Sequence, residues 1–203
     1  MLTCQNLSLA NNIGSIFSNL SFSILPASFM AIRGKNGSGK TSLLKMILGL
    51  IDHNSGNISW NKINILEDIF LFRQNVCYIG HKNALQLDLT VLDNLKFWCS
   101  LRGEKELLKP AIRYFMLDDV LDIKISLLSE GLKRRIELTK LLLYRTNLWL
   151  LDEPEVNLDN FSRDLLTNLI KIRVKEGGIV MMATHNFNEL KEECCLNIED
   201  FRK

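Results

Sequence analysis

Gly34-Lys35-Asn36-Gly37-Ser38-Gly39-Lys40-Thr41 fits the pattern G-x-x-x-x-G-K-[ST] of a phosphate-binding loop at every specified position. The largely apolar run 29–33 before it predicts a buried strand, and residues 42–50 after it place apolar side chains at helical spacing. A strand, a loop and a helix in this order are the context that the pattern requires, which disfavours a mere glycine-rich turn before an ordinary helix. The stretch therefore predicts a phosphate site within an α/β core.

The residue types in this loop suit phosphate chemistry. Its glycines let the backbone turn tightly and bring N–H groups against phosphate oxygens, and the N-terminus of the following helix favours an anion. We expect Lys40 to contact the β- and γ-phosphates of ATP and the Thr41 hydroxyl to ligate Mg²⁺. The predicted nucleotide-binding residues are Gly34, Lys35, Asn36, Gly37, Ser38, Gly39, Lys40, Thr41 and Ser42.

Composition bounds the remaining possibilities. With 203 residues, of which 47% are hydrophobic, the chain suits one domain or a core with an inserted subdomain. A net charge of +2 spread along the chain gives no case for nucleic acid as the main ligand. The five cysteines show no C-x-x-C spacing, so we expect reduced thiols in a cytosolic protein. We expect neither a signal peptide nor a transmembrane segment, so any membrane association should come through a partner.

Predicted strands alternate with helices at both ends of the chain and flank a mostly helical block. This order predicts an α/β fold with a parallel sheet and a helical insertion. The predicted strands are 2–10, 15–25, 57–60, 76–79, 148–151 and 178–183, and the predicted helices are 90–101, a stretch within 104–116, 131–144, 161–174 and 186–193.

Two carboxylates and a histidine follow predicted buried strands. Asp152 and Glu153 end the apolar run 148–151, and His185 follows the strand 178–183. Ligands of open α/β folds bind at the carboxyl ends of strands, so we expect Asp152 to hold Mg²⁺ and Glu153 to act as general base on the attacking water. His185 would reach the γ-phosphate. Taken alone, the carboxylates also fit an acidic turn, and His185 also fits a hydrogen-bonded structural histidine.

A second helix start offers another anion site. Ser129 and Gly131 lie at the beginning of the predicted helix 131–144. A serine there can cap the helix while its hydroxyl stays near a phosphate. By itself this feature is weak, because most such helix starts are only caps.

In their order along the chain, these motifs resemble the nucleotide-binding subunits of ABC transporters. The phosphate loop is followed by a signature (128–131), a Walker B strand ending at Glu153, a D-loop-like segment (156–159) and the switch histidine His185. The resemblance implies an ABC ATPase fold, a P-loop NTPase (RecA-like) core with a mixed sheet plus an inserted α-helical subdomain. The whole chain, 1–203, would form one ATP-binding domain, with its core at about 1–81 and 146–203 and its helical subdomain at about 82–145.

The resemblance also implies a head-to-tail homodimer with two ATP molecules sandwiched between the chains. Ser129 and Gly131 would then act on the nucleotide of the other chain, and Asp159 joins the nucleotide-binding residues. His81 stands where most members carry the Q-loop glutamine, which makes it a third candidate metal residue beside Thr41 and Asp152. Other positions depart from the family pattern: Leu132 replaces the signature glutamine, and no aromatic residue stands at 10–12 to stack on adenine.

Three stretches of the sequence resemble one subfamily of the ABC transporters. Residues 78–81, 148–154 and 176–180 are similar to the ATP-binding heme exporter subunits of bacterial cytochrome c maturation. This implies ATP hydrolysis coupled to heme export or heme-chaperone release, by a peripheral protein at the cytoplasmic face of the inner membrane. The implied partners are integral membrane subunits of the CcmB and CcmC type, whose coupling helix would dock near 81–87. No nucleic acid and no direct contact with the transported substrate are expected.

Three other functions remain open from the sequence. One is the ATPase of another ABC exporter with a non-heme substrate. Another is an ABC protein that acts on DNA or ribosomes, although the chain carries neither a long coiled-coil insertion nor a second cassette. The last is a nucleotide-binding module without turnover, against which Lys40, Asp152, Glu153 and His185 argue together.

Overall fold

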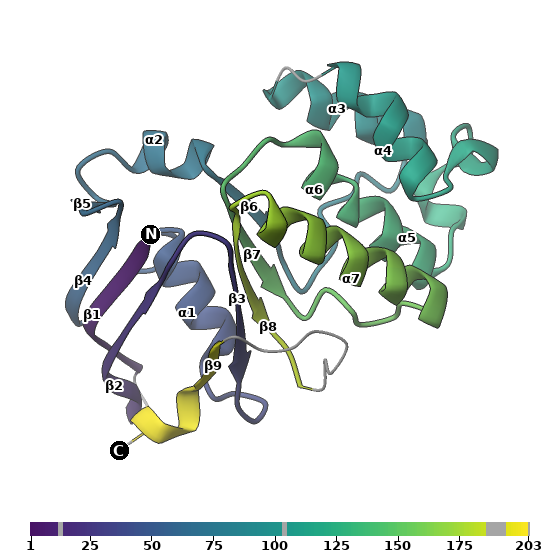
Figure 1. Cartoon of the computed structure of the whole chain (residues 1–203). Coiled ribbons are helices and arrows are strands. Elements are labelled where there is room, and N and C mark those ends of the chain that lie inside the picture. Colours follow the sequence, from purple (N-terminus) through teal and green to yellow (C-terminus); the bar gives the residue numbers. More distant parts are fainter. Residues whose placement is uncertain (12–13, 103–104, 186–193, 203) are drawn as a thin grey trace. The chain divides into compact units, whose positions relative to one another are not determined.

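The computed structural model describes residues 1–11, 14–102, 105–185 and 194–202 (Figure 1). The chain divides into two compact units. The first comprises residues 1–78, 146–153 and 171–203, and the second comprises 79–145 and 154–170. The predicted helical block 82–145 lies within the second unit, which also takes in the segment after the carboxylate pair.

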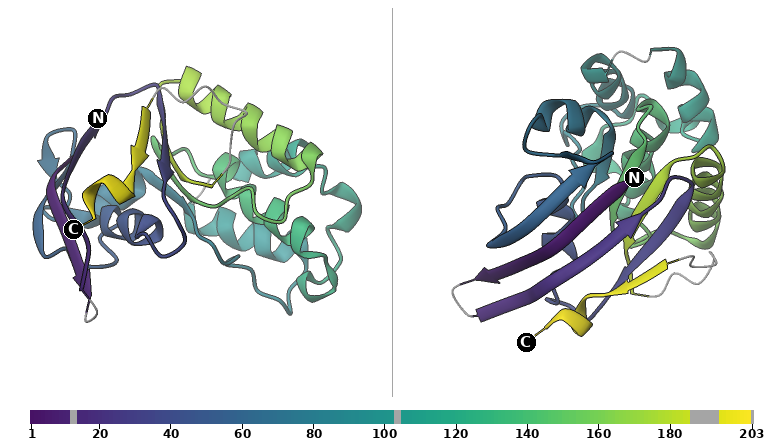
Figure 2. Two further views of the ribbon diagram at one scale, coloured as in Figure 1. Left: turned by 90° about the horizontal axis from the view of Figure 1, so that it is seen from below. Right: turned by 60° about the vertical axis from the view of Figure 1, so that its left-hand side comes forward.

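Among the described residues, the strands form two sheets. The first has the order β2-β1-β4-β5, and its strand pairs are antiparallel. Leu2 and Cys4, and then Leu7 and Leu9, are buried in β1; this is the period of two that turns one face of a strand toward a core, with a register shift between Cys4 and Leu7. In Figure 2, β1 and β2 run side by side as a long hairpin. The bounds are β1 (Leu2–Asn11), β2 (Gly14–Ile24), β4 (Ser55–Trp60) and β5 (Ile63–Asn64).

The second sheet has the order β6-β7-β8-β3-β9. Strand β3 pairs in parallel with β8 and β9, and β7 pairs in parallel with β8. Every residue of β7 and β8 is buried, as expected of parallel strands covered on both faces. The carboxyl ends of β7, β8 and β3 therefore meet at one edge. The bounds are β3 (Ser28–Arg33), β6 (Val76–Ile79), β7 (Leu148–Asp152), β8 (Ile179–Ala183) and β9 (Cys194–Asn197).

Helix α1 (Lys40–Ile47) provides the centre of the first unit's core. Its buried side chains Leu43, Leu44, Met46 and Ile47 share one apolar cluster with side chains from both sheets. The smaller elements of this unit are α2 (Ile69–Gln74) and the 3-10 helix η4 (Ile198–Phe201). Because α1 starts directly after the glycine-rich loop, the core fixes the position of that loop.

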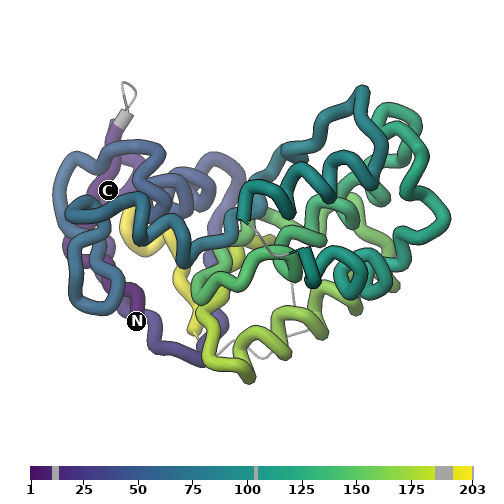
Figure 3. The backbone as a smooth tube through the Cα atoms, turned by 90° about the horizontal axis from the view of Figure 1, so that it is seen from above, coloured from purple at the N-terminus to yellow at the C-terminus, as the bar shows by residue number. Residues whose placement is uncertain are grey.

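The second unit is helical, and Figure 3 traces its backbone. A threonine side chain caps its first helix, since Thr90 Oγ1 accepts a hydrogen bond from the Asp93 N–H at 3.1 Å. Its helices are α3 (Val91–Arg102), α4 (Leu108–Tyr114), α5 (Glu130–Leu138), α6 (Lys140–Leu143) and the first part of α7 (Asn160–Lys175). Short 3-10 turns, η1 (Lys105–Leu107), η2 (Asp118–Val120) and η3 (Ile125–Leu127), connect them.

Several sequence-based expectations need correction. Parallel and antiparallel strands lie in two separate sheets, where one mixed sheet was expected. The predicted helix 131–144 is interrupted at Thr139, whose hydroxyl donates to the Ile136 carbonyl at 2.6 Å and competes with the helical pattern. The sequence reading missed α2, β5 and β9, and the predicted helix 186–193 lies outside the described residues. No helix in the described part of the chain combines the length and apolarity needed to cross a membrane.

Candidate nucleotide-binding site

The glycine-rich loop has a backbone that only glycine fits at two positions. Gly39, with φ of 104°, precedes α1, and a Cβ there would lie 2.6 Å from a side-chain carbon of Ile16. Gly34 has φ of 147°, and its Cβ would lie 2.5 Å from Ser38 Oγ. Both contacts are closer than real Cβ atoms approach, so the loop packs tightly against Ile16 of β2 and against its own residue Ser38.

Within this loop, the Ser38 hydroxyl marks a place for an acceptor. Ser38 is fully buried, and its Oγ has no hydrogen-bond partner among the described residues. A buried hydroxyl without a partner costs free energy, about 1–3 kcal/mol. A phosphate oxygen in the loop would provide the missing acceptor, so the loop fits an anionic ligand.

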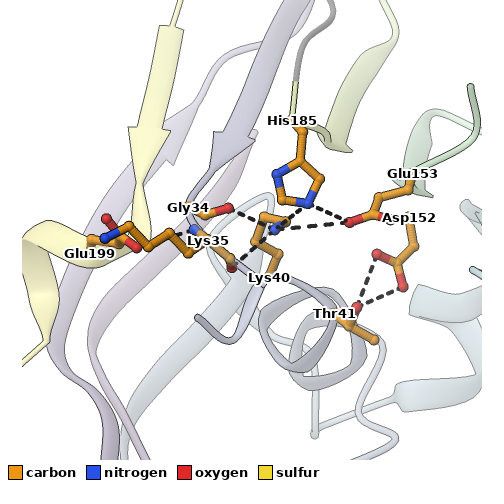
Figure 4. A network of polar contacts seen from close by, with 8 residues as sticks. All are labelled: Gly34, Lys35, Lys40, Thr41, Asp152, Glu153, His185 and Glu199. Carbon is orange, nitrogen blue, oxygen red and sulfur yellow. Dashed lines mark hydrogen bonds and ion pairs between the residues drawn. The ribbon is translucent and has the colours of Figure 1, made fainter. Parts of the chain in front are cut away.

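Lys40 connects the loop to the ends of the neighbouring strands. Its Nζ donates to the carbonyl of Gly34 at 2.8 Å and to that of Lys35 at 3.3 Å. The same nitrogen lies 3.3 Å from His185 Nε2 and 3.9 Å from Glu153 Oε1 (Figure 4). The ammonium group is almost buried, so its interactions are little weakened by solvent.

Thr41 and Asp152 form an oxygen-rich pair beside Lys40. The Thr41 hydroxyl lies 3.0 Å and 2.9 Å from the two oxygens of the Asp152 carboxylate and donates to it. Asp152 is the last residue of β7 and is buried. Magnesium is commonly held by one or two protein oxygens together with substrate phosphates. The hydroxyl and the carboxylate of this pair are oxygen donors of the kind that Mg²⁺ takes, so the pair fits Mg²⁺ shared with a phosphate ligand. No cluster of three or more His, Cys, Asp or Glu that could hold a metal occurs in the described residues.

Glu153 and His185 face each other across the end of the sheet. His185 Nε2 lies 3.2 Å from Glu153 Oε1, and the two side chains are 43% and 19% exposed, so water reaches both. Glu153 has φ of 49°, and its N–H donates to the Ala183 carbonyl at 2.9 Å. The histidine is thus held by polar contacts, and it lies beside Lys40 and Glu153 at the end of the sheet.

The signature residues lie in the second unit. The Ser129 hydroxyl caps α5 by accepting from the Leu132 N–H at 3.3 Å. A Cβ on Gly131 would lie 2.7 Å from the carbonyl oxygen of Asn157, so the signature and the D-loop-like segment touch. The Ser162 N–H donates to Asp159 at 2.7 Å, and this bond, with one from the Ser162 hydroxyl, lowers the pKa of Asp159 below its ordinary value.

His81 also lies in the second unit, on a cavity of about 400 Å³. The segment 80–86 beside this cavity is fixed by buried polar side chains of three different residues. Arg134 donates to the Gly80 carbonyl at 2.7 Å, Glu137 accepts from the Ala84 N–H at 3.1 Å, and Asn94 accepts from the Gln86 N–H at 2.8 Å. The cavity is lined by His81, Lys82, Asn83, Leu85, Leu87, Glu130, Lys133, Arg134, Val156 and Asn157.

The structure therefore groups the predicted site residues by unit. Lys40, Thr41, Asp152, Glu153 and His185 come together in the first unit, whereas His81, Ser129, Gly131 and Asp159 belong to the second. Sequence reasoning missed Glu199, which contacts the loop backbone from 164 residues away. No local pattern around Glu199 signals that contact.

The comparisons with known proteins decide the family. The model of the ABC transporter family matches residues 17–156. A relative from Wolbachia pipientis wMel, named "Cytochrome c biogenesis ATP-binding export protein CcmA", is 42% identical over 100% of this chain and 99% of its own length. The chain belongs to the ABC transporter family. Within that family it is an ABC-type ATPase, which confirms the resemblance drawn from the motifs.

Solved structures agree with membership of the ABC transporter family. A putative ABC transporter ATP-binding protein from Pyrococcus furiosus matches with a TM-score of 0.85 at 25% identity, covering 100% of this chain and 99% of that one. A dimeric ATP-binding cassette, solved in a post-hydrolysis state with ADP and Pi, matches in fold with a TM-score of 0.82 at 21% identity, covering 93% and 90%. The predicted fold class is thereby confirmed.

Proposed function

We propose that this chain hydrolyses ATP for a membrane exporter complex that handles heme in c-type cytochrome biogenesis. The observation that carries the ATP chemistry is the contact of Lys40, Glu153 and His185 beside the Thr41–Asp152 pair. The pathway is supported by the full-length relative at 42% identity, which is named for cytochrome c biogenesis. The alternative is the ATP-binding subunit of another ABC exporter with a non-heme substrate.

Each candidate site residue of the first unit has a proposed role in ATP hydrolysis. Lys40 exchanges its contacts with the Gly34 and Lys35 carbonyls for oxygens of the β- and γ-phosphates. Glu153 orients and deprotonates the attacking water, and His185, 3.2 Å away, holds that carboxylate and reaches the γ-phosphate. Backbone N–H groups of the loop and of the first turn of α1 bind the phosphates, apart from the N–H of Lys35, which donates to Glu199.

Thr41 and Asp152 are the proposed Mg²⁺ residues in this unit, directly and through water. When bound, the ion neutralises charge on the phosphates. We add His81 to the metal-facing residues from its Q-loop position alone. A Thr41→Ala variant should therefore need more Mg²⁺ for half-maximal activity.

We further propose a head-to-tail homodimer in which each site is completed by the other chain. Ser129 and Gly131 lie at the N-terminus of α5, a nine-residue helix whose first amides favour an anion. Ser129 is exposed at this helix start, so it is accessible to a nucleotide held by a second chain. Asp159 would join the shared site. A solved neighbour of the same fold, bound to ADP and Pi, is also dimeric, which supports a dimer.

The proposed partners are integral membrane subunits of the CcmB and CcmC type, at the cytoplasmic face of a bacterial inner membrane. Their contact would lie at the cavity of the second unit, where Leu87 is 53% exposed beside Leu85 and two lysines, Lys82 and Lys133. These side chains suit an apolar segment that carries an acidic residue. The whole chain, 1–203, would act as one peripheral domain, without nucleic acid and without touching the transported substrate.

Two experiments test the proposal. Phosphate release by the purified protein should require Mg²⁺ and fall strongly in Lys40→Ala. In Glu153→Gln it should nearly vanish, although this variant should still bind ATP. Full turnover in Glu153→Gln would show that Glu153 is not the base. Deletion of the gene in its host, followed by heme staining of c-type cytochromes, tests the pathway. Normal covalent heme attachment without a second gene copy would leave the non-heme exporter.

A further inference from the structure

The C-terminal segment of the chain reaches the phosphate loop. The Lys35 backbone N–H donates to Glu199 Oε1 at 3.1 Å, and Figure 4 shows Glu199 beside Gly34 and Lys35, on the side of the loop away from Asp152. Glu199 Cγ would also lie 3.7 Å from a Cβ on Gly34. This carboxylate therefore binds the backbone of the loop itself.

Glu199 is held firmly in place. Strand β9 pairs in parallel with β3. The two strands lie side by side in Figure 2. In this register, Asn197 lies opposite Arg33, the residue before the loop. Ile198 is fully buried in the core, and the Asn197 side chain accepts from the Glu199 N–H at 3.3 Å. Little conformational freedom is therefore left to lose when Glu199 binds the loop.

The backbone groups of Lys35 make several of the hydrogen bonds that hold the loop. Besides the N–H bound by Glu199, the Lys35 carbonyl accepts from the Ser38 N–H at 3.1 Å and from Lys40 Nζ at 3.3 Å. Fixing residue 35 therefore fixes the turn that leads to Ser38 and Lys40. A negative charge beside a phosphate site opposes phosphate binding by repulsion, so any benefit of Glu199 must come from position.

We propose that Glu199 is a positioning residue that keeps the phosphate loop in its binding conformation before ATP arrives. The proposal rests on the proposed ATP binding. Glu199 acts through its hydrogen bond to the Lys35 N–H, and its negative charge does not contribute to holding the loop. A glutamine retains an acceptor oxygen at the same place, whereas an alanine removes it.

The test compares Glu199→Ala, Glu199→Gln and the matched control Asp200→Asn. Asp200 stands next to Glu199 on η4, and its carboxylate accepts from the Asn197 side chain, so the control removes the same charge without the loop contact. Calorimetric titration with a non-hydrolysable ATP analogue and Mg²⁺ should show roughly three- to tenfold weaker binding in Glu199→Ala, the range of one lost hydrogen bond. Glu199→Gln should bind as well as the wild type or slightly better, and Asp200→Asn should be unchanged.

Two further readouts separate positioning from general stability. Exchange of the Lys35 amide hydrogen should speed up in Glu199→Ala and stay slow in Glu199→Gln, and KM for ATP should rise in Glu199→Ala with kcat nearly unchanged. Equal affinity of Glu199→Ala and the wild type, or an equal loss in Glu199→Gln, would overturn the inference. If the wild type bound no ATP analogue, the proposed function would be refuted instead. The amide exchange would still test the positioning role in that case, because equal exchange of the Lys35 amide in all variants would overturn it.

Discussion

Replacing Arg134 with methionine should strongly destabilise the second unit. This buried arginine donates from Nε to the Pro154 carbonyl at 3.0 Å and from Nη1 to the Gly80 carbonyl at 2.7 Å, and Nη1 also lies 3.3 Å from the Asn83 side-chain oxygen. Methionine fills part of the same space and donates nothing.

The expected size follows from these bonds. Two charge-assisted bonds to backbone carbonyls contribute about 1.5–3 kcal/mol each. Water can solvate the partly exposed Gly80 carbonyl in the variant, and the cost of burying a charge disappears, so we expect a net loss of about 3 kcal/mol. For a chain of this length, that loss corresponds to a fall in Tm of roughly 6–12 °C.

Thermal unfolding followed by far-UV circular dichroism measures this fall. The matched control is Lys133→Met, because Lys133 is the preceding residue of α5 and pairs with the exposed Glu130 at 2.9 Å. Such surface pairs contribute less than about 1 kcal/mol, so the control should change Tm only slightly. A fall in Tm for Arg134→Met no larger than that of the control would show that these three bonds do not hold the unit together.

Three other outcomes are expected. Gly39→Ala should weaken ATP binding and destabilise the fold, because the residue has φ of 104° and a methyl group would meet an isoleucine carbon at 2.6 Å. An unchanged affinity for ATP by calorimetry would contradict this geometry. Mixtures of Lys40→Ala and Ser129→Arg chains should regain part of the ATPase activity through one intact shared site, and heterodimers without activity would argue against sharing. Asp159→Ala should cost about 1 kcal/mol in urea unfolding through loss of the cap on α7. Because the Ser162 hydrogen bonds lower the Asp159 pKa, this contribution is present above the ordinary aspartate pKa and is lost as pH falls through the lowered one, so wild type and variant should converge in acid.

Elements with a strong local pattern were predictable from the sequence. The glycine-rich loop, the apolar runs of β3 and β7 and the threonine cap of α3 each carry a signal within a few residues. Because the strands end at one sheet edge, the sequence also predicted that Asp152, Glu153 and His185 would lie near the loop. The separation of the strands into two sheets was not predictable, since it depends on which distant strands pair.

Elements that depend on distant partners were missed. Strand β9 is only four residues long and owes its place to pairing with β3, more than 150 positions earlier in the chain. Helix α2 is six residues long and contains an apolar run without clear helical spacing; its signal is the Asp68 cap. The Glu199 contact depends on β9, so it could not be inferred before that strand was known.

The left-handed backbone of Glu153 has a consequence for how this site can change over generations. A φ of 49° is unfavourable for glutamate by about 1 kcal/mol or more, while glycine and asparagine adopt it readily. Substitution by either residue would relieve that strain and raise the folding stability, and it would remove the carboxylate proposed as the base. A screen for thermostable variants of this chain should therefore enrich Gly or Asn at position 153, and a screen for turnover should remove them.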